Sequence, residues 1–393
     1  MSIDALRLQS VRIRNFKAIV DSRRVALGPL TVFIGHNGSG KSSLIEALET
    51  YQAIVTDGLD AAMQRWLGIE HVRHKSVEAK ERAGKPLNPM VFDMTVGASP
   101  RRSTHIEMAV NNDAAANRMF IEREKAAHAN GWFVEKDTER TDDSFDPGRS
   151  TLGTGGAGHR AVAKHVKTWQ FMSLQPERMG LPVPQQRTGG RVRLAKDGSN
   201  VADYLLDIQR LDEQLKTQAL EGIVRTMGYV LPYARDLQPS LTSELERKAY
   251  LQLTEGSFKL PGWMLSTGTL RVLALLATLR HPEPPPLVVI EEIENGLDPR
   301  SIHLLVEEIR TAVLSGVTQV VLTTHSPYLL DLLKLDQLVL VARNDQGEPR
   351  FHRPADDASL AEWAKEFAPG RLYTMGSLHE AAKPWLALFV ARH

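Results

Sequence analysis

Residues 35–42 read Gly-His-Asn-Gly-Ser-Gly-Lys-Ser, and their spacing matches the phosphate-binding loop (P-loop) pattern G-x-x-x-x-G-K-[ST]. The glycines let the backbone curl so that consecutive N–H groups point at one anion. Lys41 adds a positive charge for terminal phosphates, and the Ser42 hydroxyl suits Mg²⁺. We therefore expect this loop to bind a nucleoside triphosphate with Mg²⁺. The expected contacts are His36, Asn37, Gly38, Ser39, Gly40, Lys41, Ser42 and Ser43.

The residues on either side of this loop predict the structure that the motif needs. Residues 30–34, Leu-Thr-Val-Phe-Ile, form a short apolar run that is typical of a buried strand. After the loop, apolar residues recur at helical spacing, so we expect residues 44–67 to be helical. The N-terminus of that helix would add its dipole to the anion site.

A second group of chemically suited residues lies far along the chain, where the apolar residues 287–290 are followed by Glu291 and Glu292. A buried strand that ends in two carboxylates without a use for them would be costly. In nucleotide hydrolysis the first acid holds Mg²⁺, directly or through water, and the second orients and deprotonates the attacking water. We therefore expect Glu291 to hold the metal and Glu292 to be the catalytic base.

Residues 265–271, Leu-Ser-Thr-Gly-Thr-Leu-Arg, resemble the signature motif of the ATP-binding-cassette (ABC) superfamily. In that superfamily the motif lies at a helix N-terminus and binds the γ-phosphate of ATP held by the other protomer. By this resemblance Ser266 would offer a hydroxyl, Gly268 a close backbone approach, and the helix its N-terminal dipole. The motif lies about 20 residues before the acid-bearing strand, which strengthens the resemblance.

Two further loops resemble motifs of the same superfamily. Residues 294–299, Glu-Asn-Gly-Leu-Asp-Pro, resemble the D-loop, in which Asp298 would face the dimer partner. Asp298 is equally suited to cap the next helix, with Pro299 in its first turn, and the two roles are compatible. Residues 317–323 predict a buried strand that ends in Thr-His-Ser-Pro. This end resembles the H-loop, in which His325 would contact the γ-phosphate.

The same superfamily places a glutamine loop between the P-loop and the signature. Residues 169–178 match it best, and Gln175 would contact the metal or its water, with Gln170 as the alternative. The resulting order is P-loop, glutamine loop, signature, acid pair, D-loop and switch histidine. That is the order of the cassette ATPases, and it extends over most of the chain.

Within the superfamily, residues 11–17, Val-Arg-Ile-Arg-Asn-Phe-Lys, and the long separation of the two ATPase lobes resemble the SMC, RecF and Rad50 branch. The signature, the proline-rich residues 282–286 and residues 291–299 resemble the compact bacterial AAA-family ATPases of the OLD-like group. The resemblance implies an α/β fold, an ABC-type P-loop ATPase head with a mixed central sheet, an antiparallel β subdomain and a helical insertion. It also implies ATP and Mg²⁺ as ligands and a homodimer or higher homo-oligomer.

Composition and periodicity suggest six segments. Residues 89–97, 104–110 and 118–124 alternate like strands of an antiparallel sheet, residues 137–160 have the composition of a mobile loop, and residues 201–228 carry one long helical pattern. The segments are 1–55, an N-terminal ATPase lobe with the P-loop; 56–88, a basic helical insertion; 89–180, a β subdomain with the mobile loop and the glutamine loop; 181–250, a helical insertion; 251–340, the C-terminal ATPase lobe; and 341–393, a C-terminal extension.

The composition excludes several classes of site. The 393 residues include no cysteine, which rules out disulfides, thiolate zinc sites, iron–sulfur clusters and a cysteine nucleophile. The net charge is +1, so a nucleic acid would have to bind a local basic patch. We find no signal-peptide pattern and no apolar stretch long enough to span a bilayer, so we expect a cytoplasmic protein without a membrane role of its own.

Two basic segments are candidates for such a patch, residues 68–86 and residues 185–196. Either could contact a phosphate backbone, although a solvated surface is the more common reason for such charge runs. They keep DNA as an alternative partner. They also motivate an alternative function, a DNA-binding ATPase of a RecF- or Rad50-like repair complex.

The leading interpretation is a nucleotide-driven switch. Stand-alone members of the OLD-like group resemble the ATPase subunits of bacterial anti-phage systems such as Septu, PARIS and certain retrons, in which the ATPase oligomer holds or gates a nuclease or toxin encoded next door. By that resemblance this chain would bind and hydrolyse ATP, dimerise and control an effector protein. A nuclease in its own right is less favoured, because the sequence has no evident second acidic metal cluster.

Overall fold

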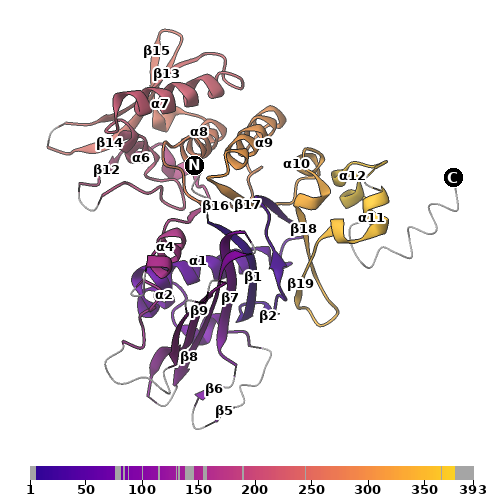
Figure 1. Ribbon diagram of the computed structural model, residues 1–393. Helices are drawn as coiled ribbons and strands as arrows, with labels where there is room; N and C mark the ends of the chain where they lie inside the picture. The colour runs from indigo at the N-terminus through magenta and orange to yellow at the C-terminus, as the bar shows by residue number, and fades with distance from the viewer. Residues whose placement is uncertain are drawn as a thin grey trace. The chain divides into compact units, whose positions relative to one another are not determined.

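The structure is a computed structural model of the chain (Figure 1). It describes residues 6–75, 81–82, 85–86, 88–99, 101–113, 116–129, 131, 133–137, 146–153, 157–187, 190–243, 245–363 and 365–376. The chain divides into two compact units, of which the first combines residues 1–169 with 333–393 and the second is residues 170–332.

The first unit contains an antiparallel sheet in the order β10-β9-β8-β7-β1-β2, with β3 paired to β1. Leu8, Val11 and Ile13 of β1 are all fully buried. In a regular strand Leu8 would face the side opposite to Val11 and Ile13, because side chains alternate between the two faces. A bulge between Leu8 and Ser10 shifts the pairing by one residue and so allows all three side chains to be buried. The strands predicted at 89–97, 104–110 and 118–124 are confirmed as β7, β8 and β9. The bounds are β1 Arg7–Phe16, β2 Ile19–Asp21, β3 Val25–Ala26, β7 Met90–Ser99, β8 Arg102–Asp113, β9 Arg118–His128 and β10 Phe133–Asp137, with a separate ladder of β5 Glu81–Arg82 and β6 Lys85–Pro86.

Helix α1 (Lys41–Asp57) packs on this sheet. The ring centroid of the fully buried Tyr51 lies 5.8 Å from that of Phe92 in β7, which lies 6.1 Å from that of Phe16 in β1. The predicted helix over 44–67 is not continuous, because Gly58 has a φ of +98° and separates α1 from α2 (Leu59–Gln64). The remaining helices of the unit are α3 Ile69–Val72, α4 Ala157–Lys167, α11 Ala358–Trp363 and α12 Pro369–Thr374, with 3₁₀ turns η2 Leu335–Gln337 and η3 Pro354–Asp356. The predicted mobile loop at 137–160 lies partly outside the described residues, and its last residues belong to α4.

The first unit also contains the strand that leads into the P-loop. This strand is β4 (Leu30–Ile34), all of whose residues are buried, as predicted. It pairs in parallel with β18 (Leu338–Arg343), which pairs antiparallel with β19 (Pro349–His352). The predicted boundary between 340 and 341 therefore falls within β18. Because β18 pairs with β4, the β18–β19 hairpin belongs to the same unit as the P-loop.

The second unit contains three parallel strands in the order β11-β16-β17. These are β11 (Gln170–Met172), β16 (Leu287–Ile290) and β17 (Gln319–Thr324), and every residue in them is buried. Burial on both faces explains why the sequence shows continuous apolar runs here rather than alternation. The helices near them are α5 Pro176–Met179, α8 Thr267–Leu279, α9 Pro299–Leu314 and α10 Pro327–Asp331, with the 3₁₀ turn η1 Gly262–Met264.

The rest of the second unit combines helices with an antiparallel sheet. The predicted single helix over 201–228 is wrong, since α6 (Val201–Ile208) and α7 (Glu213–Met227) are separate helices. Asp212 lies between them with extended backbone, and its side chain caps α7 by accepting from Gln214 N at 3.0 Å. The segment 181–250 is also not purely helical, because it holds strands. These are β12 Val183–Pro184, β13 Ala234–Leu241 and the start of β14 Lys248–Glu255, which continues to β15 Phe258–Pro261. Among the described residues we find no helix with the length and apolar character to cross a bilayer.

Candidate nucleotide-binding site

The P-loop connects β4 to α1 in the first unit. Gly38 and Gly40 have φ angles of +76° and +111°, in the left-handed region that favours glycine. Gly35 is needed for a different reason, because a Cβ there would lie 2.1 Å from the carbonyl oxygen of Val341 in β18. The three glycines are therefore explained by the curl of the loop and by its close packing on the neighbouring strand.

The loop and the first turn of α1 present groups that suit a phosphate. The Lys41 Nζ donates to the carbonyl oxygens of Gly35 and His36, at 2.5 and 3.0 Å. The buried Ser39 Oγ has no hydrogen-bond partner among the described residues, and Ser42 is exposed. No described side chain caps the N-terminus of α1, and its first turn contains no acid. Such a terminus attracts an anion, so these residues fit the phosphates of a nucleotide and, at Ser42, a bound Mg²⁺.

The P-loop opens onto a cavity of about 610 Å³ within the first unit. Four of the predicted phosphate contacts line it, namely His36, Asn37, Gly38 and Ser39. The other lining residues belong to the β18–β19 hairpin: Leu340, Val341, Ala342, Arg343, Asn344, Asp345, Arg350 and His352. The C-terminal hairpin is thus part of the surroundings of the predicted nucleotide site.

In the second unit, Glu291 directly follows β16. Its N–H donates to the carbonyl oxygen of Met172 in β11 at 2.9 Å, which extends the parallel ladder by one residue. Its Oε1 lies 3.3 Å from Lys196 Nζ, and the side chain is 17% exposed. Glu291 therefore presents a partly accessible carboxylate at the carboxyl end of a buried strand, and carboxylate oxygen is a ligand that Mg²⁺ prefers.

Glu292 has an unusual backbone conformation. Its φ is +49°, which is rare for a residue other than glycine. Its N–H donates to Thr323 Oγ1 of β17 at 2.9 Å, and its Oε2 accepts from Asn295 Nδ2 at 2.5 Å. Backbone strain that surrounding hydrogen bonds maintain is concentrated at functional sites. The strain therefore favours a functional role for the carboxylate that the sequence selected as catalytic base.

The structure adds one acid that the sequence analysis did not select, Glu294. Its Oε1 accepts from Thr324 Oγ1 and from His325 N, both at 2.8 Å, and lies 3.3 Å from His325 Nδ1. The Glu294 side chain is 8% exposed, whereas His325 is half-exposed. Glu294 therefore fixes the loop that carries the predicted switch histidine. In the sequence Glu294 was only the first residue of the segment 294–299 that resembles the D-loop, with no role assigned to it.

The signature residues lie at the start of α8. Ser266 is the N-cap of this helix, and its Oγ accepts from Thr269 N at 3.1 Å. A Cβ at Gly268 would lie 3.1 Å from the carbonyl oxygen of Gly296, so glycine allows the start of α8 to approach the D-loop closely. The expected helix N-terminus at Ser266 and Gly268 is present, and their role toward ATP stays a prediction.

Asp298 caps α9. Its Oδ1 accepts from the N–H groups of Arg300 and Ser301, at 2.9 and 3.1 Å, and its Oδ2 accepts from Ser301 Oγ at 2.6 Å. The hydrogen bond from the Ser301 hydroxyl is the main reason why the pKa of Asp298 is lowered. Pro299 follows in the first turn. The capping prediction is confirmed, and the role of Asp298 toward a dimer partner stays a prediction.

The two candidate glutamines differ in accessibility. Gln170 is buried in β11, and its Nε2 donates to the carbonyl oxygens of Phe171 and Leu194, at 3.0 and 2.9 Å. Gln175 is exposed at the N-cap position of α5. Its side chain makes no capping hydrogen bond with the described residues of that helix. Gln170 is therefore used in the core, which favours Gln175 as the residue that meets a metal or its water.

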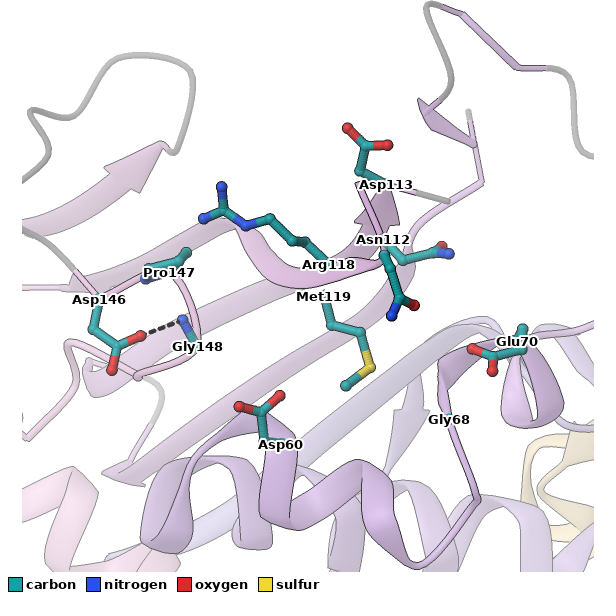
Figure 2. A pocket seen from close by; sticks show the side chains of 11 residues that line it. Asp60, Gly68, Glu70, Asn112, Asp113, Arg118, Met119, Asp146, Pro147 and Gly148 are labelled. Carbon is teal, nitrogen blue, oxygen red and sulfur yellow. Dashed lines mark hydrogen bonds between the residues drawn. The ribbon is translucent and has the colours of Figure 1, made fainter. Parts of the chain in front are cut away.

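A second cavity of the first unit, of about 690 Å³, contains none of the predicted site residues (Figure 2). It is lined mainly by acids and amides: Asp60, Gly68, Glu70, Asn112, Asp113, Asn117, Arg118, Met119, Asp146, Pro147 and Gly148. Within the part of the chain that the structure describes, no group of three His, Asp or Glu side chains could hold a metal ion. The acids of this cavity are therefore not a candidate metal centre.

The two basic segments are only partly described. Arg73 is 9% exposed, and its guanidinium donates to Asn111 Oδ1 and Asn112 Oδ1, at 3.0 and 2.6 Å. In the second segment, Arg191 forms an ion pair of 2.6 Å with Glu283. Arg73 is thus a structural residue rather than a surface one, which weakens the case for a DNA contact at 68–86. Residues 76–80, 83–84, 87 and 188–189 lie outside the described residues.

Two family models match separate parts of the chain. Residues 170–331 match the family described as "AAA domain, putative AbiEii toxin, Type IV TA system", and residues 7–53 match "AAA ATPase domain". The first match contains the signature, the acid pair and the switch histidine, and the second contains the P-loop.

Among curated proteins, the chain is similar to the Nod factor export ATP-binding protein I of Mesorhizobium japonicum, with 30% identity over 178 residues, which are 44% of this chain and 46% of the relative. The same protein of Sinorhizobium fredii is 29% identical over 180 residues, with the same two shares. The chain therefore spans about half the length of these relatives.

Among solved structures, an Smc head bound to the C-winged helix domain of ScpA has a TM-score of 0.51 at 12% identity, covering 88% of this chain and 97% of that chain. An Smc head domain with an extended coiled coil, bound to the C-terminal domain of ScpA derived from Pyrococcus furiosus, has a TM-score of 0.50 at 10% identity, covering 92% and 100%. These similarities confirm the predicted α/β fold. The chain accordingly matches two AAA ATPase domain families over parts of its length and has the fold of an SMC head.

Proposed function

We propose that this chain is a switch that binds and hydrolyses ATP, dimerises around ATP and Mg²⁺, and controls a partner protein. The strained backbone of Glu292 carries this proposal, because a carboxylate held in that conformation directly after a buried strand suits a base for an attacking water. The P-loop geometry supports it, since the loop presents Lys41 and a free helix N-terminus to an anion.

Each residue has a role that follows from its position. Lys41 would exchange a carbonyl contact for the terminal phosphates, and Ser42 and Glu291 would supply oxygen ligands to the metal. Bound Mg²⁺ would neutralise charge on the phosphates. Glu292 would orient a water and accept its proton, while Asn295 holds the carboxylate in place. His325, fixed by Glu294, would contact the γ-phosphate.

The signature resemblance assigns Ser266 and Gly268 to the ATP of a second copy. Two copies would then share each nucleotide, so dimerisation and ATP affinity would be coupled. Hydrolysis would weaken that shared contact and let the dimer open. The rate of hydrolysis would then set how long the dimer persists. Such a cycle would suit a protein that holds or releases an effector.

The effector is part of the proposal. We infer that it is a nuclease or toxin encoded nearby, in bacterial anti-phage defence, on the resemblance to the OLD-like group. The alternative is a DNA-binding ATPase of genome maintenance, which the SMC-head fold supports and the burial of Arg73 does not. A nuclease in its own right has less support, since no metal cluster occurs among the described residues.

The test is Glu292→Gln, with Glu283→Gln as a matched control at an exposed, paired carboxylate. Glu292→Gln should keep ATP binding, lower turnover by about 10²-fold or more, and accumulate dimer when ATP is present. Turnover is measured by phosphate release and dimer by light scattering. Normal turnover in Glu292→Gln would show that another residue is the base.

A further inference from the structure

The β18–β19 hairpin lies along the P-loop in the first unit. β18 pairs in parallel with β4, and the last paired residues are Leu340 and Ile34. The next residues of the two strands are Val341 and Gly35, so the P-loop begins beside the end of β18. The hairpin therefore approaches the loop from its own sheet rather than from a distant part of the chain.

The hairpin contacts the P-loop at each of its three glycines. The carbonyl oxygen of Val341 occupies the space that a Cβ of Gly35 would need, 2.1 Å away. The Pro349 ring would lie 2.5 Å from a Cβ at Gly40. Between these two packing contacts, Arg343 Nε donates to the carbonyl oxygen of Gly38 at 2.7 Å.

The contact of Arg343 with Gly38 fixes the peptide at the tip of the loop. The N–H of the same peptide, that of Ser39, donates to the carbonyl oxygen of His36 at 3.1 Å. Both ends of this peptide are therefore held, one by the hairpin and one within the loop. A loop that is already curled loses less conformational entropy when it binds phosphate.

The turn of the hairpin holds Arg343 in place. Arg343 Nη1 donates to the carbonyl oxygen of Gly347 at 2.9 Å, where Gly347 has a φ of +78°. Asn344 Oδ1 accepts from the N–H groups of Gln346 and Glu348, at 3.1 and 2.8 Å. The guanidinium is thus bonded on one side to its own turn and on the other to the P-loop.

We propose that Arg343 is a positioning residue that keeps the P-loop in its phosphate-binding curl, so that the C-terminal hairpin sets the affinity for nucleotide. This inference rests on the proposed function, since it assumes that the loop binds ATP. Arg343 acts through Gly38 and does not need to touch the nucleotide. Its loss should weaken nucleotide binding and leave the chemical step unchanged.

The test uses the full chain and isothermal titration with ATP and Mg²⁺. Arg343→Ala should raise the Kd about fivefold, because one hydrogen bond to a charged group is lost at an exposed site. The same variant should raise KM by a similar factor and keep kcat at saturating ATP. Arg343→Lys should recover part of the affinity, since it keeps the charge and one donor but not the planar fork.

Arg353→Ala is the matched control, because Arg353 follows the same hairpin, donates to a backbone carbonyl oxygen, that of Ala26 at 3.3 Å, and does not line the cavity. It should bind ATP like the unaltered chain. Equal Kd values for Arg343→Ala and the unaltered chain would overturn the inference, as would a fall in kcat at unchanged KM. If the unaltered chain bound ATP no better than Lys41→Ala, the proposed function would fail as well, and this outcome is distinct from the other two.

Discussion

Glu294→Ala is the most informative perturbation of the second unit. The substitution removes the oxygen that accepts from Thr324 Oγ1 and from His325 N, both at 2.8 Å. Thr324 is fully buried, so water would not readily replace the lost acceptor. A buried donor without an acceptor costs about 1–3 kcal/mol. Of the two donors only Thr324 Oγ1 is buried, since the hydrogen bond from His325 N lies at an exposed site, so we expect a loss of about 1–3 kcal/mol in the free energy of unfolding.

The same substitution should lower ATP turnover, because the switch histidine would no longer be held. Misplacing a group that contacts the transferred phosphate by about 1 Å can lower the rate about 10²-fold. Glu294→Gln separates the two effects. Its amide oxygen still accepts from Thr324 and His325 N, so stability should recover, while the negative charge beside His325 Nδ1 is lost.

Urea unfolding followed by tryptophan fluorescence measures the stability, and phosphate release measures turnover. Glu283→Ala is the control, because Glu283 pairs with Arg191 at a surface where its side chain is 66% exposed. Exposed ion pairs contribute about 0–1 kcal/mol, so this variant should unfold at nearly the unaltered urea concentration. The reasoning is refuted if Glu294→Ala is as stable as Glu283→Ala and hydrolyses ATP at the unaltered rate.

Two further outcomes are expected. Mixing Lys41→Ala with Ser266→Arg protomers should restore turnover that neither has alone, because one of the two shared sites would be intact; a mixture as inactive as its components would contradict the shared site. Burial lowers the pKa of His165 from 6.5 to about 4. Between these pH values the folded state therefore binds fewer protons than the unfolded state. The contribution of His165 to stability should be complete above pH 6.5 and should decline as the pH falls toward about 4. In His165→Phe the thermal midpoint should change less over that pH range, and an unchanged pH dependence would exclude His165 as its source.

Much of the fold could be predicted from the sequence because its signals are local. Residues 30–34 and 287–290 are short apolar runs, which predict buried strands, and the structure has buried strands with these bounds. Helix breaks were harder to see. Gly58 and Asp212 interrupt predicted helices, and at both positions a single backbone conformation overrides an apolar periodicity that continues across the break.

The sequence by itself selected the residues that we expect to carry the chemistry. Residue types and spacing selected the P-loop, Glu291, Glu292 and His325, because each motif lies within a few residues of one strand end. Tertiary structure decided what holds them. Glu294 reaches His325 from another loop, and Arg343 reaches Gly38 across 305 positions of sequence. Contacts between segments so far apart leave no periodicity or spacing in a single sequence, so only the folded chain reveals them.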